Sequence, residues 1–416
     1  MTAAAPGRGV LREAALRIAR ELCDTAVWDS ASHRCNWMGR RDVVDGGADA
    51  GIASGALGPE LYAGSAGVAL FLAEAYGASG EARFLETALG ALARSVAYLR
   101  HDPRGASPLS FHAGHLGVAW VLTRVRALEP AAGMDAELAW LVHGAAGAAP
   151  PEVPDVIVGH AGAIPALLRL ARTPGLEEYR TVAERLGDDL LDRAVWEGDV
   201  CHWAPPPGQD RPAPLTGLSH GASGMALALA ELADGAEGAH LRGARGGFAF
   251  EDRFFSADEG NWADTRFAMR RDGGRLDATF QNAWCHGAPG IALARARAAE
   301  LDPERAEGHA RMAAVAAATT REAALRRLDQ EGADATLCHG LAGLSEVLLA
   351  TTPEGARAAE VVAGRLVERY GEAGSWPSGV NAGGPNPSLM IGTAGIGHHL
   401  LRLVEPGAVE PVLVLR

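Results

Sequence analysis

Short apolar runs recur along the chain, and each begins at a pair of glycines separated by two residues. The runs have helical spacing, as residues 68–73 and 225–230 illustrate. Seven such pairs open an apolar run, with 45 to 66 residues between successive first glycines: Gly64/Gly67, Gly114/Gly117, Gly159/Gly162, Gly221/Gly224, Gly287/Gly290, Gly340/Gly343 and Gly392/Gly395. A repeat of this length predicts seven buried inner helices, one for each pair.

The segments between these runs are more polar. Residues 81–100, 176–195 and 303–328 are rich in Ala, Leu, Arg and Glu, which predicts outer helices with one solvated face. Seven inner helices alternating with seven outer ones would close into an all-α fold, an α/α toroid of nested barrels. Glycines at the start of each inner helix let the loops crowd toward the axis and leave backbone N–H groups unpaired there. Chemistry is therefore expected at one end of the barrel.

Composition indicates one large domain. The chain has 416 residues, of which 48% are hydrophobic and 21% charged, and no linker or low-complexity tract divides it. We expect an N-terminal helical cap over residues 1–48, toroid repeats over 49–404 and a C-terminal tail over 405–416.

Charge and hydropathy limit the location and the partners. Residues 1–22 lack the continuous apolar stretch of a signal peptide, and no apolar span of eighteen residues occurs elsewhere, which predicts a cytoplasmic protein without membrane insertion. The formal net charge of −13 argues against nucleic acid and anionic membranes as partners.

The cysteines indicate thiol chemistry or metal binding. There are five, and an odd number argues against a disulfide framework. A Cys-His-Gly element begins at Cys285 and again, 53 residues later, at Cys338. Cys285, Cys338 and His339 would suit Zn²⁺, because thiolate and imidazole are its preferred donors and a catalytic zinc keeps three protein ligands and one open position. The alternative is that each cysteine is a small buried hydrophobic residue at a tight turn.

Taken together, the motifs resemble the lanthionine synthetase C-like cyclase family, whose bacterial members close thioether rings in lanthipeptides. The resemblance covers nearly the whole chain and rests on these segments: 35–37, 61–67, 155–159, 219–221, 260–262, 283–287, 337–340 and 389–397. Residues 250–262 and 283–291 are most similar to the C-terminal cyclase domain of class II synthetases, in which a dehydratase domain precedes the cyclase. Because 416 residues leave no room for that domain, the resemblance implies a cyclase alone, with dehydration supplied by another polypeptide.

The resemblance also implies one Zn²⁺, carried over onto Cys285, Cys338 and His339. Two cysteinate ligands cancel the charge of zinc, so a third thiolate from the substrate would make the centre anionic. That would keep the substrate sulfur deprotonated near neutral pH, although a free thiol has a pKa of roughly 8.5, and leave it electron-rich. The sulfur is expected to attack the β-carbon of dehydroalanine or dehydrobutyrine in a dehydrated precursor peptide. The enolate then takes a proton at the α-carbon, which gives lanthionine or methyllanthionine.

Three further residues are candidates for moving those protons. His220 matches the catalytic histidine of the family and is expected to protonate the enolate or deprotonate the thiol, unless it is a plain polar cap. Asp155 matches an Asp-x-x-x-Gly element and is expected to orient the substrate or tune a proton-transfer group, unless it is only a carboxylate at a helix N-terminus. His286 stands where some relatives carry tyrosine and is expected to be a second proton-transfer group or a group that supports the metal ligands from behind. Gln281 replaces an arginine of many stand-alone relatives, which leaves open how the enolate oxygen is stabilised.

Other functions stay open from the sequence. An enzyme that adds a small thiol such as glutathione to dehydroamino acids would share this metal site and lack a peptide groove. A non-catalytic scaffold that recruits a precursor peptide to a dehydratase would not need the Cys and His set. Zinc-dependent prenyl transfer normally uses Asp-Cys-His ligands, which the two Cys-His-Gly copies do not offer.

Overall fold

The computed structural model describes residues 7–43, 51–102, 106–204, 214–233, 238–270, 276–380 and 384–415. The expected N-terminal cap and C-terminal tail therefore lie partly outside the described residues, at 1–6, 44–48 and 416. None of the helices in the described part is long and apolar enough to cross a membrane. The cytoplasmic location stays a prediction.

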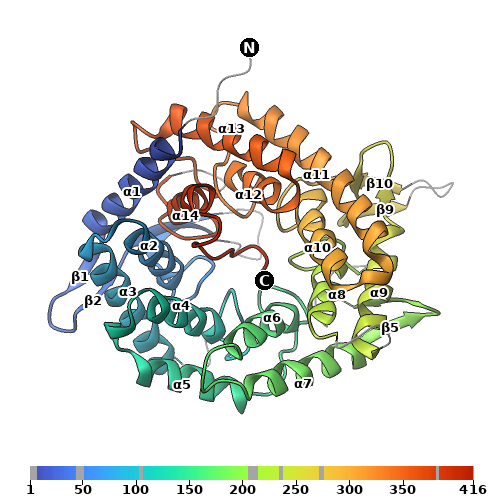
Figure 1. Ribbon diagram of the computed structural model, residues 1–416, viewed down its shortest axis with the longest axis horizontal. Coiled ribbons are helices and arrows are strands. Elements are labelled where there is room, and N and C mark those ends of the chain that lie inside the picture. The colour runs from blue at the N-terminus through green and yellow to red at the C-terminus, as the bar shows by residue number, and fades with distance from the viewer. Residues whose placement is uncertain are drawn as a thin grey trace.

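Among the described residues, seven helices form an inner ring, which surrounds a central axis (Figure 1). They are α2 (Ser65–Ser79), α4 (His115–Leu128), α6 (His160–Leu170), α8 (Ala222–Glu231), α10 (Ala288–Leu301), α12 (Leu341–Thr351) and α14 (Thr393–Val404). Each begins directly after the first glycine of a Gly-x-x-Gly pair. Each packs against the next in order, and α14 packs against α2, so the ring is closed. The prediction of seven inner helices in an α/α toroid is confirmed.

Seven outer helices in the described part of the chain surround this ring. They are α1 (Arg8–Thr25), α3 (Ala82–His101), α5 (Asp135–Ala146), α7 (Tyr179–Asp192), α9 (Ala239–Asp252), α11 (Ala306–Leu328) and α13 (Pro353–Tyr370). Each outer helix after α1 packs against the inner helix that precedes it in the chain, and α1 packs against α14. The segment expected to form an N-terminal cap thus contributes a helix that occupies an outer-ring position.

Burial explains why the two rings have different sequence patterns. In α2 every residue from 65 to 75 is buried, because neighbouring inner helices, outer helices and the axis surround it. In α3 the buried residues, among them Ala88, Leu92 and Leu99, follow one stripe of the helix. An all-apolar run therefore marks an inner helix and an amphipathic run an outer one.

Five antiparallel hairpins in the described residues were not predicted. They pair β1 (Val27–Asp29) with β2 (Arg34–Asn36), β3 (Met38–Val43) with β4 (Gly51–Ala56), β5 (Ala194–Glu197) with β6 (Val200–Trp203), β7 (Phe255–Ser256) with β8 (Asn261–Trp262), and β9 (Asp264–Arg270) with β10 (Leu276–Thr279). They leave no clear alternating pattern in the sequence, because all of these strands are short and those of β5–β8 span at most four residues. They lie in connections between helices and leave the toroid intact.

The Gly-x-x-Gly pairs fold each loop back onto the helix it precedes. A Cβ on Gly290 would lie 2.1 Å from the carbonyl oxygen of Trp284, and one on Gly343 would lie 1.9 Å from that of Leu337. Gly287 also has a φ of 83°, in the left-handed region that favours glycine. Any side chain at these positions would push the loop away from the first helical turn.

Backbone hydrogen bonds then join these loops into a circle at the N-terminal ends of the inner helices. The N–H to O bonds are Tyr62 to His112 (2.9 Å), Val156 to Ser219 (2.9 Å), Ser219 to Cys285 (3.2 Å), Trp284 to Cys338 (2.9 Å), Cys338 to Met390 (2.9 Å) and Met390 to Tyr62 (2.9 Å). The hydroxyl of Ser110 completes the circle by donating to Ile157 O at 2.9 Å. Residues far apart in sequence therefore meet around one axis.

The end of the chain lies inside the ring (Figure 1). Arg402 of α14 donates to the carbonyl of Val409 at 2.7 Å and so turns the tail inward. The indole N–H of Trp284 donates to the carbonyl of Leu413 at 3.0 Å. Both contacts tie the tail to helices and loops of the inner ring.

Candidate metal and thiol site

Repeat-equivalent loop positions face one cavity. The residues two positions before each first glycine are Tyr62, His112, Ile157, Ser219, Cys285, Cys338 and Met390. The residue one position before is histidine in three consecutive repeats, at His220, His286 and His339. A cavity of about 880 Å³ is lined by five of the first set, all but His112 and Met390, and by all three of these histidines. The structure therefore brings every predicted cysteine and histidine of the site to one cavity.

The two predicted cysteine ligands lie together. Hydrogen bonding from the Cys338 thiol lowers the pKa of Cys285 to about 6, against the effect of burial, and the positive charges of His339 and Arg266 add to this. Burial raises the pKa of Cys338, and the neighbouring Cys285 raises it further. The hydroxyl of Tyr62 donates to Cys338 Sγ at 2.9 Å. Of the two thiols, Cys285 is therefore the one whose surroundings favour the thiolate, whereas burial alone would disfavour it.

An acidic side chain, that of Asp334, contacts the Nδ1 side of the His339 ring. This Nδ1 lies 3.1 Å from Asp334 Oδ2. Burial lowers the pKa of His339, but the hydrogen bond to Asp334 and the negative charge of Cys285 outweigh it, so the net pKa is raised. A Cβ on Gly379 would lie 3.2 Å from ring atoms of His339, so this glycine lets the backbone pack against the imidazole.

These residues fit a zinc site in their chemistry. Two adjacent sulfurs and one imidazole are donors that zinc prefers, and an Asp behind the imidazole is the usual outer partner of a ligating histidine. In the described ranges, no three His, Cys, Asp or Glu side chains already stand in a metal-ligand arrangement. All three donors line one cavity, and His339 has its Nδ1 turned to Asp334.

His220 and Asp155 form a hydrogen-bonded pair at the cavity. His220 Nδ1 lies 2.6 Å from Asp155 Oδ2, although 65 residues separate them in sequence. The other carboxylate oxygen of Asp155 accepts from the backbone N–H of Val158 at 2.8 Å. Asp155 is therefore both a turn residue before α6 and the partner that orients the His220 ring. The His220 side chain is 36% exposed, which leaves Nε2 as its ring nitrogen for a bound molecule.

The ring of His286 packs against that of His220. Their ring centroids are 5.8 Å apart. His286 is 2% exposed, and its Nδ1 has no hydrogen-bond partner in the described part of the chain. Burial lowers the pKa of His286 to about 3, and the nearby charge of Arg266 lowers it further, although Asp264 opposes this.

Three residues at the site were not predicted from sequence. Tyr62 contacts Cys338 Sγ, Asp334 contacts His339, and Arg266 of β9 lines the cavity beside Cys285. A signal for Tyr62 exists, because it occupies the same position before its glycine as the two cysteines do. Asp334 and Arg266 lie outside the repeated element, and nothing in their local sequence distinguishes them.

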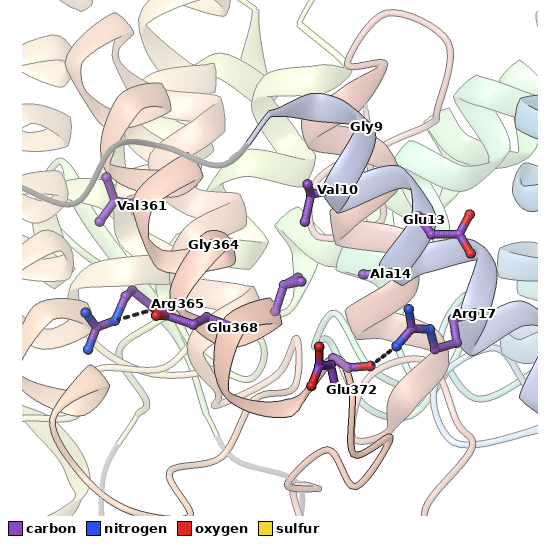
Figure 2. A pocket seen from close by; sticks show the side chains of 12 residues that line it. Gly9, Val10, Glu13, Ala14, Arg17, Val361, Gly364, Arg365, Glu368 and Glu372 are labelled. Carbon is purple, nitrogen blue, oxygen red and sulfur yellow. Dashed lines mark hydrogen bonds and ion pairs between the residues drawn. The ribbon is translucent and has the colours of Figure 1, made fainter.

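A second cavity of about 740 Å³ lies between α1 and α13 on the outer ring (Figure 2). No cysteine or histidine lines it. Arg17 donates to the carbonyl of Gly371 at 2.7 Å, and Arg365 lies 3.6 Å from Glu368, so these charged side chains bridge local groups. The described residues of this groove therefore offer neither a thiol nor an imidazole for the chemistry expected from the sequence.

Comparison with known proteins agrees with the toroid fold. The structure is similar to that of nisin cyclase, with a TM-score of 0.62 and 17% sequence identity over 96% of this chain and 94% of that chain. At this identity the likeness shows a common fold. The closer resemblance to class II cyclase domains stays a prediction. A model of the family described as lanthionine synthetase C-like protein matches residues 55–414. The chain therefore belongs to the lanthionine synthetase C-like family.

Proposed function

We propose that this protein is a cyclase that adds cysteine thiols to dehydroalanine or dehydrobutyrine within one peptide, forming lanthionine or methyllanthionine rings. Membership of the lanthionine synthetase C-like family supports this proposal. The observation that carries it is the meeting of two thiols, Cys285 and Cys338, with the His220–Asp155 pair at one cavity. A scaffold that only recruits a peptide has no need for that combination.

We propose that Cys285, Cys338 and His339 hold Zn²⁺. Bound there, the metal would keep a substrate thiol deprotonated near neutral pH while leaving it nucleophilic. Asp334 would orient the His339 ring through Nδ1, and Tyr62 would hold Cys338 in place through its hydroxyl.

His220 is the proposed proton carrier. Thiol addition removes one proton from sulfur and delivers one to the α-carbon, so a nearby group must take up and release protons. Asp155 engages Nδ1 of His220 and fixes the ring, so Nε2 can face the peptide. Because His286 is buried, we assign it a supporting place behind His220, where it packs against that ring.

The substrate would be a peptide whose serine and threonine residues have already been dehydrated. A cavity of about 880 Å³ has room for a short peptide segment. Because thiol addition begins from dehydrated residues, a dehydratase must act first, and we propose that a separate one does so.

The test uses a dehydrated, cysteine-containing peptide incubated with the zinc-loaded protein. Ring closure leaves the peptide mass unchanged and removes a thiol, so mass spectrometry after thiol alkylation detects it. Wild type is expected to convert the peptide thiol into a thioether, so that it no longer reacts with the alkylating reagent. Cys285→Ala should lose this activity together with its zinc. Cys23→Ala is the matched control, because Cys23 lies outside the cavity and its thiol contacts the carbonyl of Arg83.

Two results would count against the proposal. If wild type with bound zinc leaves the peptide thiol open to alkylation, the chain is not a cyclase for such peptides. If the peptide instead gains the mass of glutathione when that thiol is present, addition of a small thiol is the better description.

A further inference from the structure

One charged side chain at the cavity has no place yet in the proposed reaction. Arg266 lies on β9 and lines the cavity together with Cys285, His286 and His220. Among the described lining residues it is the one with a permanent positive charge. Its positive charge adds to the hydrogen bonding from Cys338 that lowers the pKa of Cys285, and to the burial that lowers the pKa of His286.

The proposed reaction places negative charge on an oxygen. When the thiolate forms its bond to the β-carbon, the π electrons of the alkene move toward the carbonyl and give an enolate. The enolate then takes a proton at the α-carbon, and the thioether is complete with no other bond broken. Donors fixed in advance around the developing oxyanion are usually the largest single contribution to catalysis of such steps.

We propose that Arg266 donates to the carbonyl oxygen of the dehydrated residue and stabilises this enolate, which makes it a further catalytic residue. The inference rests on the proposed cyclase function. A guanidinium suits the task because it is always charged and presents several N–H donors in one plane. Gln281, which lines the same cavity, offers only a neutral amide.

Residues 263–266, at the start of the β9–β10 hairpin, hold Arg266 in position, and we call them the hairpin base. Nε and Nη2 of Arg266 donate to the two carboxylate oxygens of Asp264, at 3.0 Å and 2.7 Å. The side chain of Asp264 is almost fully buried, whereas that of Arg266 is 27% exposed. The carboxylate therefore fixes one edge of the guanidinium from inside the protein, as preorganisation requires.

The same hairpin base is joined to the loop that carries His220. Thr265 donates through Oγ1 to Pro214 O at 3.0 Å, and Thr216 donates through Oγ1 to Ala263 O at 2.6 Å. Arg266 and His220 are thus held on one connected support. A cation for the oxygen and a proton carrier for the α-carbon would act on the same bound residue.

The other explanation of Arg266 is structural, since its ion pair with Asp264 spans only two residues and could merely brace the hairpin. The two roles differ in what a substitution changes. Loss of an oxyanion donor lowers kcat and leaves substrate binding, zinc content and unfolding nearly unchanged. Loss of a brace changes thermal unfolding and zinc content as well.

The experiment compares wild type, Arg266→Gln and Arg266→Lys in ring closure of the dehydrated, cysteine-containing peptide, with zinc content and thermal unfolding measured on the same samples. Arg266→Gln is expected to lower kcat by about 100-fold with KM changed by less than about threefold. Arg266→Lys should recover part of the rate, because lysine keeps the positive charge. The recovery should be incomplete, because lysine lacks the planar set of N–H donors of the guanidinium. Arg253→Gln is the control, since Arg253 is also ion-paired, with Glu197 at 2.7 Å, and does not line the cavity.

Separate outcomes overturn the inference and the function beneath it. If wild type closes rings and Arg266→Gln closes them within about threefold of its kcat, the cyclase stands and Arg266 is not catalytic. Arg266 is likewise not catalytic if the rate falls only in step with zinc content or unfolding temperature. If wild type itself closes no rings, the cyclase proposal fails, and this inference fails with it.

Discussion

Two histidine–carboxylate pairs in this toroid have nearly the same geometry and opposite surroundings. Nδ1 lies 2.6 Å from the carboxylate oxygen in the His220–Asp155 pair and 2.8 Å in the His399–Glu346 pair. The His220 side chain is 36% exposed and lines the cavity, whereas that of His399 is 1% exposed. A similar hydrogen bond therefore occurs at an accessible cavity in one place and in the core in the other.

The second ring nitrogen separates the two pairs. Nε2 of His399 lies 2.7 Å from the hydroxyl of Ser345, so both of its nitrogens are engaged inside the protein. The other oxygen of Glu346 accepts from Arg402 at 2.9 Å. We refer to Ser345, Glu346, His399 and Arg402 as the enclosed network. A histidine can act on a substrate only if one ring nitrogen faces solvent, and His220 meets that condition.

The largest expected effect tests the enclosed network. Glu346→Gln removes the partner of buried Arg402 and should lower the free energy of unfolding by about 3 to 5 kcal/mol, the usual result of leaving one buried charge unpaired. Denaturant unfolding measures this. Glu368→Gln, which breaks an exposed pair with Arg365, should cost less than about 1 kcal/mol. Equal losses in the two variants would mean that enclosure does not strengthen the pair.

The matching change at the cavity should affect rate instead of stability. His220→Asn is expected to lower kcat for ring closure by about 100-fold, equivalent to roughly 2.7 kcal/mol in the barrier, because general acid–base catalysis contributes at least that much. His399→Asn should show the reverse, with lower stability and a normal rate for the folded protein. A His220→Asn variant that keeps its rate while losing stability would show that the two pairs have the same structural role.

The inner helices and the two cysteines of the site could be predicted from the sequence. The seven inner helices follow from a local rule, since a Cβ at Gly290 or Gly343 would collide with a carbonyl of the preceding turn. The same rule sets the positions before each glycine, so two Cys-His-Gly copies 53 residues apart fall in adjacent loops. Cys285 and Cys338 were therefore found without knowledge of any distant contact.

Other features depend on contacts that no local pattern encodes. Tyr62 and Cys338 meet although they lie 276 residues apart, because the ring closes between α14 and α2. Arg266 lies on a short hairpin between helices, where neither a repeat nor an apolar pattern indicates that it faces the cavity. His399 and His220 both sit near a Gly-x-x-Gly pair, and only the packed structure distinguishes the enclosed histidine from the accessible one.

A smaller expected effect is a loss of stability at acidic pH. Burial lowers the pKa of His398 to about 3; Glu346 opposes this, while Arg402, His399 and Arg124 lower it further. The unfolded chain takes up this proton near pH 6.5 and the folded protein does not. Stability should therefore fall as the pH drops below 6.5, by up to about 1.4 kcal/mol per pH unit from this histidine.

His398→Gln tests that expectation, because it removes the titrating group from the edge of the enclosed network. The variant should show a shallower decrease in the free energy of unfolding between pH 6.5 and pH 5 than wild type does. Other buried histidines, including His309, whose pKa burial lowers to about 4, would supply the remaining slope. Identical slopes in wild type and variant would mean that His398 does not resist protonation in the folded state.

The smallest expected effect concerns Trp284, which connects the enclosed network with the loops of the cavity. Its indole N–H donates to Leu413 O at 3.0 Å, and its backbone N–H donates to Cys338 O at 2.9 Å. One residue thus connects the tail, which Arg402 of the enclosed network turns inward, to both proposed cysteine ligands. Trp284→Phe removes only the indole donor and should lower the free energy of unfolding by about 1 kcal/mol.

Trp203→Phe is the matched variant, because Trp203 is equally buried and its indole N–H donates to Leu190 O at 2.8 Å, away from the cavity. Both variants should lose similar stability, and only Trp284→Phe should also weaken zinc binding in competition with a chromogenic chelator. The weakening should stay below the roughly tenfold typical of partners bonded to a ligand side chain itself, since Trp284 acts through the backbone beside Cys285. If zinc affinity is unchanged in both, the tail braces the barrel without positioning the site, and the accessible and enclosed regions act independently of each other.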